Sequence, residues 1–75
     1  MKVKSQKQIA QNLAESSVLA YLSEKKGLTW VLGVIKKSGV DKQDLQRIFS
    51  NFRTEHGGTV RFQELESKCK ELSLI

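Results

Sequence analysis

The chain has 75 residues, of which 39% are apolar and 28% charged, and its formal net charge at pH 7 is +5. A chain this short forms one small domain and buries only about 60% of the surface that it exposes when unfolded, which leaves little room for a deep catalytic cleft. Its longest apolar run, Trp30 to Ile35, has six residues. A membrane-spanning helix needs about 20, so we expect a soluble protein. The chain has one cysteine, Cys69, and therefore no internal disulfide, which favours the cytoplasm or another reducing compartment. With one cysteine and one histidine, His56, we expect no zinc site.

The excess positive charge lies in the first half of the chain. Residues 1–40 have seven lysines and two glutamates, whereas residues 41–75 have six basic and six acidic side chains. This asymmetry predicts an acidic partner, either nucleic acid or an acidic protein surface, although lysines that keep a small domain soluble would give the same composition. The basic face would consist of Lys2, Lys4, Lys7, Lys25, Lys26, Lys36, Lys37 and Lys42.

Helical periodicity predicts two helices in the first half, over about residues 5–22 and 29–38. The apolar arc of the first helix comprises Ile9, Ala10, Leu13, Ala14, Val18, Tyr21 and Leu22. Lys25-Lys26-Gly27 is predicted to end this helix, and Thr29 to cap the second. Because the second helix is apolar around most of its circumference, we expect it to be the central and most buried one.

The second half predicts two more helices, over about residues 41–55 and 62–73, with a short extended segment near 59–61 between them. Asp41 is a typical N-cap residue for the third helix, and Gly57-Gly58 is predicted to end it. The apolar residues of the third helix are Leu45, Ile48, Phe49 and Phe52, and those of the fourth are Phe62, Leu65, Cys69 and Leu72. The expected fold is a compact all-α four-helix domain that spans residues 1–75.

The residues needed for catalysis are scarce in this sequence. Cys69 and His56 are the only candidates for a nucleophile and its base, but Cys69 falls on an apolar helical stripe and His56 in a glycine turn. The glycines also lack the spacing of a phosphate-binding loop. We therefore expect neither an enzyme nor a cofactor.

Residues 45–65 carry a more specific pattern. Phe49 and Phe52 precede a 12-residue segment that starts at Arg53, with Gly58 in its sixth place, Val60 in its eighth and Glu64 in its twelfth. This pattern resembles a calmodulin-like EF-hand. The resemblance is specific only over residues 45–65, and a pair of such hands would have about the length of this chain.

The ligand positions of this segment depart from the EF-hand pattern. Arg53 stands at the first ligand place, where the family has aspartate, Glu55 and Gly57 stand at the third and fifth, and Arg61 at the ninth. Two arginines beside the site would repel a cation. The resemblance therefore implies a degenerate hand that does not bind calcium.

Paired EF-hands grip an amphipathic helix of a partner in an apolar groove. The resemblance thus implies a calcium-independent protein-interaction domain that holds an amphipathic or acidic segment. The candidate lining of the groove is Trp30, Val34, Phe49, Phe52, Cys69 and Leu72. For any single one of these residues, ordinary core packing is the simpler explanation.

The alternative interpretation is a small basic DNA-binding protein. Residues 31–39, 40–52 and 59–75 match the order of a helix-turn-helix or winged-helix core, and the positive charge suits phosphate contacts. Against it, the predicted connection over residues 53–58 exceeds the usual three or four residues. The proposed recognition helix is also rich in acids, at Glu64, Glu66 and Glu71. A homodimer that buries a leftover apolar stripe is a further arrangement that the sequence leaves open.

Overall fold

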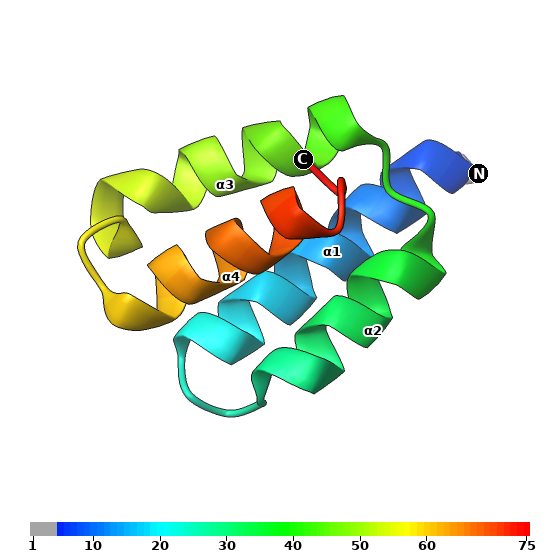
Figure 1. Cartoon of the computed structure of the whole chain (residues 1–75). Helices are drawn as coiled ribbons and strands as arrows, with labels where there is room; N and C mark the ends of the chain where they lie inside the picture. The colour runs from blue at the N-terminus through cyan, green and yellow to red at the C-terminus, as the bar shows by residue number, and fades with distance from the viewer. Residues whose placement is uncertain (1–4) are drawn as a thin grey trace.

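A computed structural model describes residues 5–75, which form four helices and no strand (Figure 1). They are α1 (Gln6–Leu22), α2 (Leu28–Ser38), α3 (Lys42–His56) and α4 (Val60–Glu71). Successive helices run in alternating directions along the long axis of the domain (Figure 1). The predicted all-α fold is confirmed, and each predicted helix end lies within two residues of the observed one.

Short polar side chains and one glycine define several helix ends. The hydroxyl of Ser5 accepts a hydrogen bond from the Gln8 N–H at the start of α1, and Thr59 accepts one from the Phe62 N–H at the start of α4, each at 3.2 Å. Gly39 ends α2 with φ 71°, in the left-handed region that glycine adopts without steric cost. The two hydroxyl contacts, from Ser5 and Thr59, satisfy N–H groups that the first turn of a helix leaves without a partner.

Two connections differ from the predictions made from the sequence. The chain leaves α1 at Glu24, which has φ 63°, and Gly27 is the N-cap of α2 rather than the end of α1. Of the segment predicted to be extended, only Thr59 is extended, and Val60 and Arg61 already belong to α4. The physical reason is the Thr59 cap, which starts the helix directly after itself.

α1 is the central helix, since it packs against α2, α3 and α4. The prediction that the second helix would be the most buried is wrong. α2 turns Val31, Leu32 and Ile35 toward the core but leaves Trp30 40% exposed. α2 packs mainly on α1, so the side of α2 that points away from α1 stays open to solvent despite its apolar residues.

Aromatic side chains from three helices fill the core. Tyr21 of α1, Phe49 of α3 and Phe62 of α4 are each no more than 1% exposed. The rings of Phe49 and Phe62 meet edge to face, with centroids 5.8 Å apart. This contact joins α4 to α3, which lie side by side (Figure 1).

Candidate partner-binding surface

The six residues predicted to line a groove do not lie on one surface. Phe49 and Cys69 are core residues, with exposed fractions of 1% and 0%, so they are closed to a partner. Their assignment to a groove is corrected by this burial. Trp30 and Leu72 are exposed, whereas Val34 and Phe52 are partly buried.

The predicted basic face is divided between the two ends of α2. Lys25 and Lys26 lie in the turn before α2, and Lys36 and Lys37 lie in its last turn. Lys42 is the first residue of α3, while Lys2 and Lys4 lie outside the described residues. Four lysines of the predicted basic face therefore lie at the two ends of α2, while Lys7 and Lys42 lie on other helices.

The solvent-facing side of α2 combines an exposed aromatic ring with positive charge. Residues 25–38 contain no acidic side chain. The spacing of Lys26, Trp30, Gly33 and Lys37, at intervals of four, three and four residues, places them along one side of the helix and its preceding turn. The Lys26 ammonium lies 5.4 Å from the centroid of the Trp30 ring, which confirms that these two side chains meet. We refer to Lys26, Trp30, Gly33, Val34 and Lys37 as the α2 face.

α1 also exposes apolar side chains that the sequence predicted to be buried. Ile9 and Leu13, one helical turn apart, are 46% and 48% exposed. Both residues belong to the predicted apolar arc of α1, but the neighbouring helices cover only part of that arc. Lys7 and Glu15 are the only charged residues of α1, so its outer side is nearly uncharged.

The segment that resembles an EF-hand loop is mostly helical in the structure. Arg53 to His56 form the last turn of α3 and Val60 to Glu64 the first turns of α4, so only residues 57–59 connect the two helices. The arrangement departs here from the 12-residue loop that the resemblance implies. Glu55, Gly58 and Glu64 are exposed around this short turn. Within residues 5–75, no three His, Cys, Asp or Glu side chains come together to form a metal site.

The two arginines of this segment make contacts inside the domain. Arg53 pairs with Glu66 of α4. The Nε of Arg61 donates to the Tyr21 carbonyl at 2.8 Å, and one of its terminal nitrogens donates to the Lys26 carbonyl at 2.7 Å. Its guanidinium also lies 4.2 Å from the centroid of the Tyr21 ring. Arg61 thus ties α4 to the end of α1 and to the following turn, a role that sequence reasoning missed.

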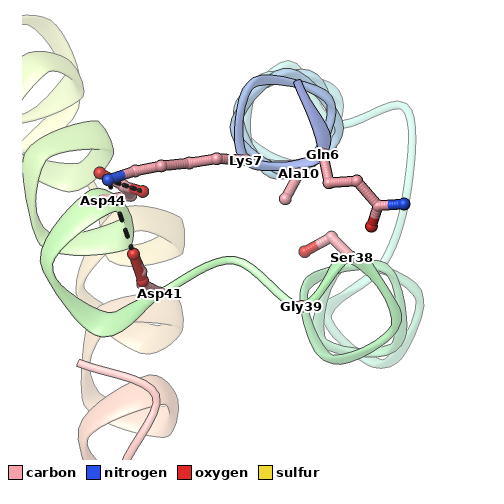
Figure 2. Close-up of a pocket in the computed structure, with 7 residues that line it drawn as sticks. All are labelled: Gln6, Lys7, Ala10, Ser38, Gly39, Asp41 and Asp44. Atoms are coloured by element: carbon pink, nitrogen blue, oxygen red, sulfur yellow. Dashed lines mark ion pairs between the residues drawn. The ribbon is translucent and has the colours of Figure 1, made fainter. Parts of the chain in front are cut away.

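A hollow of about 280 Å³ lies where the start of α1, the end of α2 and the start of α3 meet (Figure 2). Lys7 reaches across it, with its Nζ 3.9 Å from Asp41 Oδ2 and 3.8 Å from Asp44 Oδ2. The Asp44 side chain is 6% exposed, and its Oδ2 accepts no hydrogen bond from any residue in the range 5–75. The Lys7 ammonium is therefore paired with two carboxylates of the domain, although its side chain remains 64% exposed.

The candidate nucleophile is poorly suited to chemistry at neutral pH. Burial raises the pKa of the Cys69 thiol to about 11. Burial also raises the pKa of Tyr21, an effect that outweighs the opposing influence of the Arg61 charge. Because the thiolate is the reactive form of cysteine, a protonated buried thiol reacts slowly.

Comparisons with protein-family models, with curated proteins and with solved structures give no match for this chain. No helix formed by residues 5–75 is long and apolar enough to cross a membrane. Proposals about function therefore rest on the residues and contacts of the chain itself.

Proposed function

We propose that this chain is a non-enzymatic, calcium-independent protein-binding domain whose α2 face receives an acidic amphipathic segment of another protein. One observation carries the proposal. Trp30, the only tryptophan, is 40% exposed on a helix without acidic side chains, between Lys26 on one side and Lys37 on the other.

The physical chemistry of this face suits protein recognition. Tryptophan is strongly enriched among the residues that dominate binding energy, because one ring removes a large apolar area from water on association. Val34, one turn along the helix from Trp30, extends the apolar area. Lysines at the two ends of α2 would attract acidic groups and so set the orientation of the bound segment. Such charges raise the association rate more than they raise the affinity.

The proposal that the domain binds its partner without calcium rests on the arginines around residues 57–59. A hard cation needs several oxygen ligands, whereas Arg53 and Arg61 bring two guanidinium groups to the helices on either side of this turn. The proposal that the domain is not an enzyme is supported by the burial of Cys69 and by its raised pKa.

The test is binding of a fluorescently labelled peptide, measured by anisotropy. The probe is a helix-forming peptide of about 18 residues with leucines on one face and glutamates near both ends, the length of five turns. We expect micromolar binding that weakens from about 50 to 200 mM salt, since exposed charges are screened. A scrambled peptide of the same composition should bind far more weakly.

Replacing Trp30 tests whether the α2 face is the binding surface. The variant Trp30→Ala should weaken binding by at least about tenfold, equivalent to about 1.4 kcal/mol, because a central aromatic residue carries much of the binding energy. Leu72→Ala, which changes an apolar residue of similar exposure at the end of α4, should leave the affinity unchanged. Equal affinities for Trp30→Ala and the unchanged protein would overturn the proposal.

DNA binding is the second candidate, and one observation favours it. The connection between α3 and α4 has three residues, 57–59, which fits a helix-turn-helix turn and corrects the longer connection predicted from the sequence. Against it, Arg61 is engaged with α1 and Glu64 and Glu71 are exposed on α4. A labelled DNA duplex in the same assay distinguishes the two candidates. Tight binding to DNA with a steep salt dependence, and none to the acidic peptide, would favour this candidate.

A further inference from the structure

Gly33 lies in the middle of α2, where the packing of the domain gives no reason for a glycine. A Cβ placed on Gly33 would meet no atom of residues 5–75 within 4 Å apart from its own helix and chain neighbours. Its backbone is helical, and the positive φ that would demand glycine occurs instead at Gly39. A mid-helix glycine is unfavourable compared with alanine because it loses more conformational freedom on folding. The isolated domain therefore gains nothing from Gly33.

The position of Gly33 on the α2 face suggests what this glycine permits. Trp30 lies one turn before it and Lys37 one turn after it on the same side of the helix. Without a side chain at Gly33, the backbone of α2 is open to a close approach by another molecule. Two helices pack 8–10 Å apart depending on the side chains at their contact, so a glycine at the crossing point allows the shortest separation.

We infer that the partner segment binds as an α-helix that crosses α2 at Gly33, an inference that rests on the proposed function of the α2 face. Trp30 would pack on one side of the crossing and Lys37 would face acidic side chains on the other. α2 has 11 residues and is roughly 16 Å long, with Lys26 in the turn before it and Lys37 in its last turn. The partner helix would match this spacing with acidic groups about three turns apart. A peptide that adds a strand to the edge of a sheet would find no such edge among residues 5–75, which form four helices.

The test combines two substitutions at Gly33 with the peptide described above. Gly33→Ala and Gly33→Leu should both raise the Tm of the free domain, by roughly 4–8 °C for a domain of this size. Both should weaken peptide binding, Gly33→Leu by about tenfold or more, because a side chain now holds the two helices apart. Asn51→Ala, at an exposed position of α3, is the matched control. It should raise the Tm without changing the affinity.

The two substitutions separate a close crossing from simple apolar attraction. Leucine adds apolar surface to the α2 face, so an affinity of Gly33→Leu equal to or higher than that of the unchanged protein would overturn the crossing at Gly33. If Trp30→Ala still weakens binding in that case, the proposed function stands and only the crossing fails. If the unchanged protein does not bind the peptide, the proposed function itself fails.

A proline at the centre of the peptide provides an independent check of the helical form. Because proline disrupts a helix, the proline peptide should bind at least about tenfold more weakly than its parent. Equal binding of both peptides would contradict a helical partner, whatever the effect of the Gly33 variants.

Discussion

The Cys69 thiol is enclosed by the core, and this makes the stability of the domain sensitive to alkaline pH. Its pKa is about 11 in the folded chain, compared with an ordinary value of 9.0. Below pH 9 the thiol is protonated in both the folded and the unfolded states. Above pH 9 the unfolded chain loses this proton first, so ionisation favours unfolding.

We therefore expect the free energy of unfolding to fall as the pH rises from about 9 to 11, by at most about 1.4 kcal/mol per pH unit from this group. Tyr21, whose pKa is also raised by burial, adds to the loss at the upper end of this range. Urea unfolding at several pH values measures the effect. In Cys69→Ala the decline should be shallower, with the remainder due to Tyr21. Parallel pH curves for Cys69→Ala and the unchanged protein would contradict this account.

At the scale of helices, Arg61 joins the second half of the chain to the first through hydrogen bonds. It reaches from α4 to the carbonyl of Tyr21, in the last turn of α1, and to that of Lys26, in the turn before α2. One side chain thus fixes the start of α4 against the turn that leads into α2.

Replacing Arg61 by alanine should destabilise the domain by roughly 1–3 kcal/mol, because two charge-assisted hydrogen bonds and a cation–π contact are lost. Arg61→Lys should have an intermediate effect, since an ammonium group keeps the charge but not the forked geometry. Arg47→Ala, at an exposed position of α3, is the control and should change stability by less than about 0.5 kcal/mol. An Arg61→Ala variant as stable as Arg47→Ala would show that these contacts are unimportant.

The helices themselves were predictable because their caps and apolar spacing are local properties of the sequence. Asp41 and the apolar residues of α3, for example, mark the position of that helix without reference to the rest of the fold. Glu24 was not predictable, since its left-handed conformation is imposed by the turn into α2 and not by its own preference. The Thr59 cap follows Gly58 directly and was a local signal for an earlier start of α4.

The arrangement of the helices depends on contacts that periodicity does not encode. The apolar pattern of α2 predicted burial, but α1 became the central helix and left Trp30 exposed. For the same reason, the groove residues Phe49 and Cys69 could not be distinguished from the core by their spacing alone. Gly33 was noticeable in the sequence as a glycine inside a helical pattern. The proposal of a helix crossing also needed the structure, which shows that Gly33 faces open space.

Across the whole molecule, some basic side chains form ion pairs inside the domain, whereas the lysines near α2 are proposed to meet a partner. The Lys7 ammonium lies near the carboxylates of Asp41 and Asp44 (Figure 2). Arg53 pairs with Glu66. The lysines at the two ends of α2 have no acidic residue on their own helix. Residues 25–38 carry Lys25, Lys26, Lys36 and Lys37 and no acidic side chain, and the exposed ring of Trp30 lies within this segment.

The most direct test is a charge reversal of the lysines on the α2 face, together with Lys36, which lies next to Lys37 in the last turn of α2. In the variant Lys26→Glu, Lys36→Glu, Lys37→Glu, binding of the acidic peptide should be lost, because like charges now face each other, and a peptide with lysines in place of its glutamates should bind instead. The matched control reverses three exposed basic residues elsewhere, Lys42, Arg47 and Lys70, with the same change of net charge. The account predicts that this control retains most of its affinity for the acidic peptide. Equal losses in both triple variants would show that only net charge matters and would contradict a binding site on α2.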